Sequence, residues 1–223
     1  MKKQMTWLLY ACGSAFFAGV TSILAKQGIQ KTDSNVATAV RTAVILFFSW
    51  IVVFLAGSQG QIFTVGRKTM IFLILSGAAT GASWLCYFRA LQLGDINKVV
   101  PIDKSSTVLT IVLAFLFLQE GISLEKGIGA IAIAVGTFLM IEEKKEKGRK
   151  KEKGYSWFFY ACGSAFFASL TAILGKIGIS GVDSNLGTAI RTAVVLVMAW
   201  MMVFIMGKGR EVKEIPQKEM AFI

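Results

Sequence analysis

The sequence predicts an all-α integral membrane protein, a bundle of membrane-spanning helices. Of its 223 residues, 55% are hydrophobic and 17% are charged, and the mean hydropathy is +0.63. Soluble domains average about 45–50% apolar and about 25% charged residues. Here the apolar residues lie in long runs, each reaching the roughly 20 residues needed to cross a hydrocarbon core about 30 Å thick. An ordinary soluble enzyme is therefore excluded.

Seven apolar runs are predicted to span the membrane, and an eighth begins near Met220. In chain order they cover about 5–25, 34–56, 69–91, 98–119, 126–142, 155–175 and 184–206. The run EEKKEKGRKKEKG at 142–154 is too charged to be anything but a solvated linker. Lys2 and Lys3 precede the first run as in a cleaved signal peptide. A near-copy of that run lies deep inside the chain, however, so we expect a spanning helix.

The second part of the chain repeats the first at a constant offset of 150 residues, from 7 to 157. WLLYACGSAFFAGVTSILAKQGI at 7–29 reappears as WFFYACGSAFFASLTAILGKIGI at 157–179. DSNVATAVRTAVILFFSWIVVF, which opens at Asp33, reappears as DSNLGTAIRTAVVLVMAWMMVF, which opens at Asp183. Such self-similarity marks a duplicated structural unit.

The repeat divides the chain into two units. Residues 1–142 form a first unit of five helices, 143–154 form the basic linker, and 155–223 hold two helices of a second unit and the start of its third. We therefore expect the chain to be a fragment of a ten-helix protein. Because five is odd, the second unit must enter the membrane upside down relative to the first. Inverted repeats of this kind are typical of secondary transporters, which bind their substrate at the repeat interface near the midplane.

The distribution of lysine and arginine predicts the orientation in the membrane. Most of these residues fall in the linker and in the loops on its side of the membrane. Cytoplasmic loops carry an excess of lysine and arginine. We therefore expect a multi-pass protein of the cell membrane with the linker 143–154 in the cytoplasm and the N-terminus outside.

Ionisable residues within spans are costly and are candidates for function. Arg41 lies about 10 Å into its helix, counted from an expected N-cap at Asp33 or Ser34, and Arg191 repeats it in the second unit. Two interpretations fit both arginines. Either the side chain extends to the headgroups, or it faces a polar cavity.

The stretch 84–106 holds the other candidates for the substrate path. Trp84, Tyr87 and Phe88 form an aromatic cluster at helical spacing, and Asp103 and Lys104 follow. The cluster fits either an interfacial aromatic and basic belt or a binding site. Asp103 fits either a group that couples transport to a proton or sodium ion, or a structural partner of a neighbouring cation. Because the candidates are mostly cationic and aromatic, they favour anionic, zwitterionic or neutral substrates over organic cations.

Several functional classes lack the residues they need. The chain has no histidine, which excludes His-based metal sites and Ser-His-Asp triads. Its three cysteines, Cys12, Cys86 and Cys162, lie inside apolar runs and suit helix packing better than disulfides. The net charge of +11 comes without a nucleic-acid-binding motif. We therefore expect no enzyme, no cofactor, no metal and no nucleic-acid partner.

Small residues mark the helix faces that pack closely in lipid. The first, third and fifth runs carry such stripes, for example SGAATGAS at 76–83 and GIGAIAIAVG at 127–136. Generic helix packing explains all of them. The stripe at 127–136 also fits a contact between subunits, so a homodimer through small-residue faces is a second interpretation.

The five-helix unit resembles the EamA-type transporters of the drug/metabolite transporter superfamily. The resemblance is carried by three segments: TSILAKQGI at 21–29, DSNVATAVRT at 33–42, and SGAATGASWLCYFRALQLGDINKVVPIDKSSTVLTIVLAFLFLQE at 76–120. It covers essentially the whole chain. It implies transport of amino acids, metabolites or drugs by alternating access, efflux above all, through a lipid-embedded protein without a cofactor.

The resemblance also leaves alternatives. A lipid-carrier flippase of the same superfamily would use the same fold, and an inactive truncated fragment or a membrane scaffold would need no substrate. Ten-helix relatives keep both termini in the cytosol, which would put the linker outside, against the charge distribution of this chain. Gln119 stands where many relatives have a glycine before the glutamate.

Overall fold

The computed structural model describes residues 2–119, 121, 124–139, 155–179, 181–220 and 222. The predicted linker 143–154 lies outside them. The elements, in chain order, are α1 (Lys2–Gly28), α2 (Ser34–Leu55), η1 (Gln59–Phe63), α3 (Arg67–Leu93), α4 (Ile96–Lys104), α5 (Ser106–Leu118), α6 (Leu124–Leu139), α7 (Ser156–Gly178), α8 (Ser184–Ile205), η2 (Lys208–Glu214) and α9 (Gln217–Met220).

The described residues form helices and the loops between them, and no strand, as the all-α prediction requires. Six helical segments are long and apolar enough to cross a membrane, with α4 and α5 together forming one of them. Seven were predicted. The remaining one, the fifth predicted run at about 126–142, coincides with α6, of which 16 residues are described. The apolar surface of these helices suits a lipid environment, and the chain is a multi-pass membrane protein.

The predicted fourth span at 98–119 is two helices in the structure. The break falls at Ser105, whose amide bonds to the carbonyls of Pro101 and Ile102. Proline lacks the N–H that an uninterrupted helix requires. Upstream, Gly94 ends α3 and Asp95 caps α4 by accepting a hydrogen bond from the Asn97 amide at 3.0 Å.

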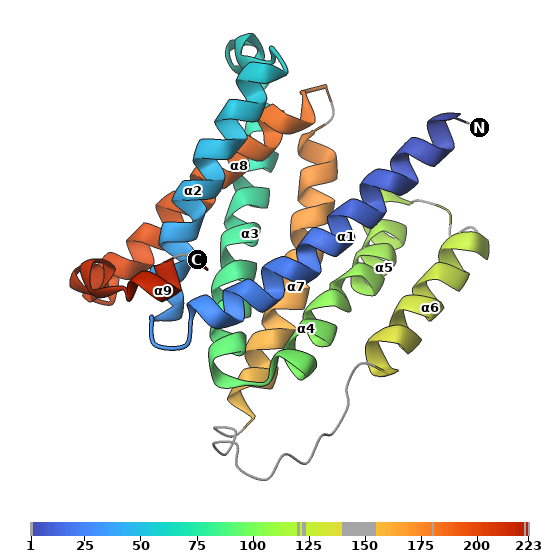
Figure 1. Cartoon of the computed structure of the whole chain (residues 1–223). Helices are drawn as coiled ribbons and strands as arrows, with labels where there is room; N and C mark the ends of the chain where they lie inside the picture. Colours follow the sequence, from blue (N-terminus) through green and yellow to red (C-terminus); the bar gives the residue numbers. More distant parts are fainter. Residues whose placement is uncertain are drawn as a thin grey trace.

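Corresponding helices of the two repeats run in opposite directions (Figure 1). The first helix, α1, descends from the N-terminus, whereas its copy α7 rises from the bottom of the view. Likewise α2 rises and its copy α8 descends. Tight packing joins the two parts of the chain, since α3 packs most extensively against α7 and α2 packs along α8.

Small residues allow this close packing. A Cβ atom on Gly77 of α3 would lie 2.8 Å from the Arg191 carbonyl oxygen and 2.8 Å from the Val194 Cβ in α8. A Cβ on Gly178 of α7 would lie 3.2 Å from the Leu73 amide in α3. Without a hydrophobic driving force between helices in lipid, such close backbone approach stabilises their association.

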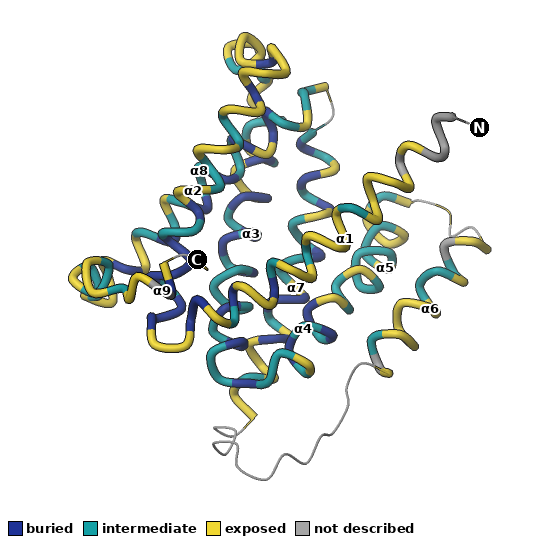
Figure 2. Tube along the Cα trace, viewed as in Figure 1, coloured by how far each residue is buried: buried dark blue, intermediate teal, exposed yellow. Residues whose placement is uncertain are grey.

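The sequence ACGSAFFA occurs in both α1 and α7, but several of its small residues are buried in α7 and exposed in α1. In α7, Ala161, Ser164 and Ala165 are buried, whereas their copies in α1 are exposed. Figure 2 shows the difference as a mostly yellow first half of α1 beside the blue inner faces of α3 and α7. Only the last turns of α1 join the bundle. The local sequence therefore does not determine burial here; the neighbouring helices do.

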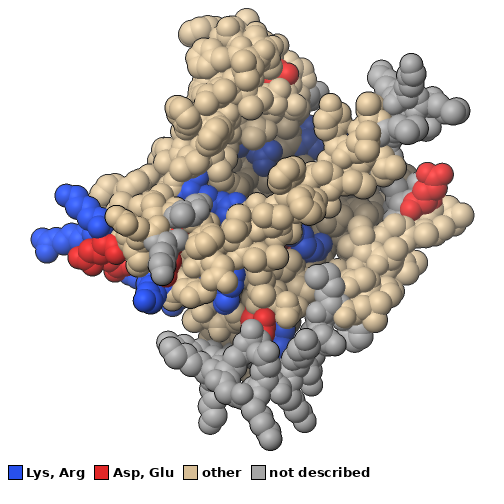
Figure 3. Space-filling model, in the orientation of Figure 1, with Lys and Arg blue, Asp and Glu red and all other residues tan. Residues whose placement is uncertain are grey.

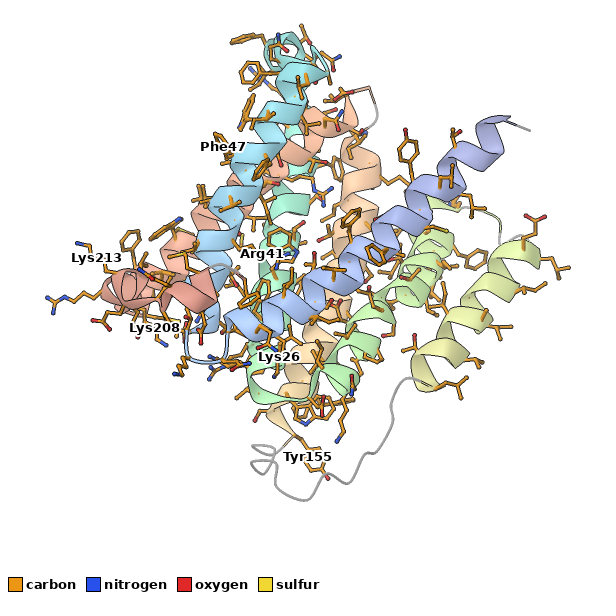
Figure 4. All side chains as sticks on the ribbon, viewed as in Figure 1. Lys26, Arg41, Phe47, Tyr155, Lys208 and Lys213 are labelled. Carbon is orange, nitrogen blue, oxygen red and sulfur yellow. The ribbon has the colours of Figure 1, made fainter. Side chains whose placement is uncertain are left out.

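Charged residues hold the chain together at the end where α1 turns into α2. Asp33 caps α2 by accepting the Asn35 amide at 2.9 Å, and it pairs with Lys208, which follows α8, at 2.5 Å. Figure 4 shows Lys208 at this end of the bundle, with Lys26 nearby. Burial opposes ionisation of Asp33, but hydrogen bonds from Lys208 and Asn35, together with the lysine charge, lower its pKa below the ordinary value.

Glu219 of α9 binds the same turn. Its carboxylate is 7% exposed and accepts the amides of Lys31 and Thr32, at 3.0 and 2.8 Å, and the Thr32 hydroxyl at 2.6 Å. The residue at this place in the first unit is Thr69. The short helix α9 is thus fastened to the α1–α2 turn by a carboxylate that its counterpart lacks.

The repeat-related contact at the opposite end of the bundle uses a different partner. There Asp183 caps α8 by accepting the Asn185 amide at 3.0 Å, and its own amide donates to Gln61 Oε1 at 3.0 Å. Partial burial opposes ionisation of Asp183, but hydrogen bonds from the Leu186 amide, Ser58 and Asn185 lower its pKa below the ordinary value. Ser58 and Lys208 occupy equivalent positions in the two units.

Candidate functional site

Arg41, Phe88 and Tyr87 come together where α1, α2 and α3 meet. The Arg41 guanidinium lies 5.5 Å from the centre of the Phe88 ring, within the range of a cation–π interaction. The Tyr87 hydroxyl donates to Ser22 Oγ of α1 at 3.0 Å. Trp84 packs against the same apolar cluster, one turn before Phe88. The aromatic residues predicted to form one group do so.

Arg41 lies deep along α2 and points toward α1 and α3 (Figure 4). It is half-buried. Lysine and arginine side chains occupy a hollow on this face of the molecule, between α1 and the α2–α8 pair (Figure 3). Arg41, which points from α2 toward α1 (Figure 4), therefore faces the side of the molecule on which this hollow lies.

Asp103 has one partner on α7 and one in its own helix. Its Oδ1 accepts from Ser164 Oγ of α7 at 2.5 Å, and its Oδ2 pairs with Lys104 at 3.1 Å. Ser164 is bonded in turn to α3, since Ser83 donates to the Ser164 carbonyl at 3.1 Å. Asp103 is 7% exposed, whereas Lys104 is largely exposed. The carboxylate therefore joins α4 to α7.

Arg191 lies apart from Arg41, against the other part of α3. Its Nη2 donates to Thr80 Oγ1 at 3.2 Å, and Thr80 in turn lies 3.3 Å from the Thr171 hydroxyl of α7. Gly175 of α7 leaves room for it, since a Cβ there would lie 3.3 Å from Arg191 Nη1. Helices α3, α7 and α8 thus enclose Arg191.

The hydroxyl partners of these groups escaped the sequence analysis. Ser22, Ser83, Ser164 and Thr80 sit on small-residue faces and were expected only to allow close packing. Their signal was present: a serine or threonine on an interhelical face is also a hydrogen-bond donor. The repeat shows that this signal alone does not identify the bonded serine. Ser14 and Ser164 are copies of each other, but Ser14 is exposed and Ser164 is buried.

A cavity of approximately 340 Å³ lies at the end of the bundle that holds Asp183. It is lined by residues of the α2–α3 connection, the start of α3 and the α7–α8 turn: Gln61, Thr64, Val65, Gly66, Thr69, Gly181, Val182 and Asp183. None of the predicted path residues lines it. The residues that the structure describes contain no cluster of His, Cys, Asp and Glu side chains suited to a metal ion.

The Asp103 network gives a direct prediction for Ser164. Ser164→Ala is expected to lower the free energy of unfolding by about 1–2 kcal/mol, because the buried Asp103 carboxylate loses a donor. Ser14→Ala changes the same residue in the same local sequence where the side chain is exposed, and is expected to stay within about 0.5 kcal/mol of the wild type. Unfolding in mixed micelles measures both. Equal effects would show that the Ser164–Asp103 bond contributes nothing.

The comparisons with known proteins agree with this architecture. The family profile described as the EamA-like transporter family matches residues 5–142. A Sinorhizobium protein named as an uncharacterized transporter in the cobO 3′ region is 42% identical over 137 residues, which cover 61% of this chain and 97% of the relative. An uncharacterized protein of Methanocaldococcus jannaschii is 28% identical over 102 residues, 42% of this chain and 74% of the relative. No solved structure matches the chain significantly.

The family match fits the apolar helices and points to a transporter rather than an enzyme. The resemblance seen in the sequence is thereby confirmed. Since the profile covers more than half of its residues, the chain belongs to the EamA-like transporter family.

Proposed function

We propose that this protein is a secondary transporter that moves a small molecule across the cell membrane by alternating access. In this proposal the substrate path runs between two inverted units, the first at 1–142 and the second beginning at 155 after a cytoplasmic linker at 143–154. Transport is directed outward. The family relationship supports a transporter in general; the mechanism and direction are the proposal.

The arrangement of the helices supports an inverted repeat. Repeat-related helices run in opposite directions, and α2 with α8 and α3 with α7 form the contacts that join the two parts. In alternating access, one repeat rocks against the other around a site near the midplane. In this chain the most extensive helix contacts join the two units, and such a motion would rearrange them.

The observation that carries the proposal is a cation–aromatic group at this junction. Arg41 lies over Phe88, far from the helix ends, where an ionisable side chain is retained for function more often than for packing. We propose that the path passes Arg41, Trp84, Tyr87 and Phe88, and that Asp103, Lys104 and Arg191 border it. The last three have internal partners that hold the surrounding helices in place.

A flux assay tests the activity. The full chain is reconstituted into liposomes and assayed with a panel of amino acids, organic acids, neutral metabolites and cationic drugs. We expect flux of at least one compound well above protein-free liposomes, and faster uptake into inside-out than into right-side-out vesicles. Absence of flux for the whole panel would count against transport, and the reverse preference of the vesicles would replace efflux by uptake.

A labelling experiment on the same protein tests the inverted arrangement. Single cysteines at positions 31 and 181, in a background without Cys12, Cys86 and Cys162, are exposed to a membrane-impermeant thiol reagent. The two turns are repeat-related, so they are expected to react from opposite faces of the membrane. Labelling from one face would contradict alternating access between inverted units, whatever the flux assay gives.

We also propose a homodimer through the small-residue face of α6. Its isoleucine and valine side chains Ile128, Ile131 and Val135 are exposed, and among the described residues the main contacts of α6 are with α5 and α4. A lipid-carrier flippase remains the second candidate, because a cation in a hollow also suits a phosphate headgroup.

A further inference from the structure

We propose that the transported molecule carries an anionic group, a carboxylate or a phosphate, and that Arg41 is the residue that binds it. The inference rests on the proposed transport function and names the substrate class. It comes from the different surroundings of two arginines that the repeat makes equivalent, Arg41 and Arg191.

Arg41 has a charge but no counter-ion in the described part of the chain. The ion pairs described there join Asp103 to Lys104 and Asp33 to Lys208. None of the N–H groups of Arg41 donates a hydrogen bond to another described residue; its contact is with the face of Phe88. A guanidinium has five donors, and a cation–π interaction satisfies none of them. Arg41 therefore presents its full donor set to whatever enters the hollow.

Arg191 shows what the same residue does when a hydroxyl group lies within reach. Its Nη2 donates to Thr80, and it packs over Gly175 among α3, α7 and α8. The difference follows from the neighbouring helices, because α7 packs extensively against α3, whereas its copy α1 makes far fewer contacts with α3. Both arginines are half-buried, and of the two only Arg41 lacks a hydrogen-bond partner among the described residues.

The surroundings of Arg41 suit an anion. Carboxylates and phosphates accept the planar donor pair of arginine in a bidentate manner, and the charge-assisted bonds are stronger in a site with little water. Tyr87, which is half-buried beside Phe88, offers an aromatic surface for the apolar part of the ligand, whereas Phe88 itself is buried. The nearest candidate for pairing with a cation, Asp103, is already occupied by Ser164 and Lys104. An organic cation would find repulsion here and no free carboxylate.

Binding to the full chain in phosphatidylcholine nanodiscs tests the inference, with tryptophan fluorescence as the readout because Trp84 packs beside the group. The probes are inorganic phosphate and three matched compounds, benzoate, benzyl alcohol and benzylamine. We expect benzoate to bind at least tenfold more tightly than benzylamine. Arg41→Gln is expected to weaken anion binding roughly 10- to 100-fold, and Arg41→Lys by less, because the charge remains but the bidentate fork is lost.

Arg89→Gln is the control, since it removes an arginine of α3 that the proposal does not place in the path and whose guanidinium already donates to Gln92 at 2.6 Å. It is expected to leave anion affinity within about twofold once circular dichroism shows that both variants retain their helices. The inference is overturned by any of three results: benzylamine binding as tightly as benzoate, an unchanged anion affinity in Arg41→Gln, or no binding of either anion to the wild type.

The source of the anion is identified by competition with a phosphatidate lipid added to the nanodiscs. Displacement of benzoate by the lipid would assign the Arg41 site to a lipid headgroup, and its absence would assign it to a soluble anion. These experiments distinguish a failure of the transport proposal from a failure of the proposed substrate class. Anion binding that requires Arg41 without any flux would refute transport alone, whereas cation flux that ignores Arg41→Gln would refute the substrate class alone.

Discussion

Replacing Gly77 by valine is expected to force α3 away from α8 and to lower the free energy of unfolding by about 3 kcal/mol, the cost of inserting side-chain atoms into a tightly packed interface. The first atom added would already lie 2.8 Å from the Arg191 carbonyl oxygen, and backbone cannot move aside as a flexible side chain can. The same substitution displaces the backbone that carries Arg191. Unfolding in mixed micelles measures the loss.

Gly19→Val in α1 is the control for this substitution. It places the same side chain in a helix of similar apolar sequence, but nothing lies within 4 Å of the Cβ position. The free energy of unfolding is expected to change by less than about 1 kcal/mol. If the two variants were equally destabilised, the loss would come from the change in helix propensity, and the contact between α3 and α8 would be looser than described.

Removing the Glu219 carboxylate is expected to release the α1–α2 turn. In Glu219→Ala, the amides of Lys31 and Thr32 and the Thr32 hydroxyl lose their acceptor. Hydrogen bonds to a charged group contribute about 1.5–3 kcal/mol each. A loss of about 3 kcal/mol in the local opening free energy corresponds to roughly 100-fold faster amide exchange. Hydrogen exchange of peptides that cover the turn, read by mass spectrometry, measures it.

Two further variants test whether the faster amide exchange comes from the lost bonds between Glu219 and the turn. Glu219→Gln keeps one amide oxygen as an acceptor and is expected to fall between alanine and the wild type. Glu214→Ala removes an exposed carboxylate from η2 and is expected to leave the exchange of the turn unchanged. Exchange that rose equally in the Glu214 and Glu219 variants would mean that net charge, rather than the bonds to the turn, governs this end of the molecule.

The sequence predicted the helices well because membrane insertion leaves few choices. Every backbone polar group in lipid must be bonded within its own segment, so an apolar run of sufficient length becomes a helix. The N-cap expected at Asp33 or Ser34 followed from local chemistry, and the structure places it at Asp33. The break at Ser105 was not predicted, because a proline in a helix is compatible with continuation, a bend or a break.

The candidate site was predicted only in part. Spacing along α3 placed Trp84, Tyr87 and Phe88 together, and burial of a charge singled out Arg41. Sequence gave no means of choosing which helix would face Arg41, because such a choice depends on contacts between distant segments. The different surroundings of Arg41 and Arg191 show this directly, since near-identical local sequences place one arginine over an aromatic ring and let the other donate to a hydroxyl group.

The Glu219 contact was missed for the same reason. In sequence, Glu219 lies in a charged stretch that reads as a solvated connection, and only the folded chain brings it to Thr32, 187 positions earlier. The offset between the repeats held one hint, since Thr69 occupies the equivalent place. A difference between two copies of a unit identifies a position at which the copies form different contacts. It does not identify the residue that is contacted.

The two ends of the bundle are related by the repeat, yet one is joined by the Lys208–Asp33 ion pair and the other by the Asp183 amide, which donates to the Gln61 side chain. Dissolved ions weaken an attraction between opposite charges far more than a hydrogen bond between two uncharged groups. The two solutions that bathe a membrane differ in ionic composition. A change in salt on the Lys208 side would therefore loosen that end, while the same change on the Gln61 side would have little effect.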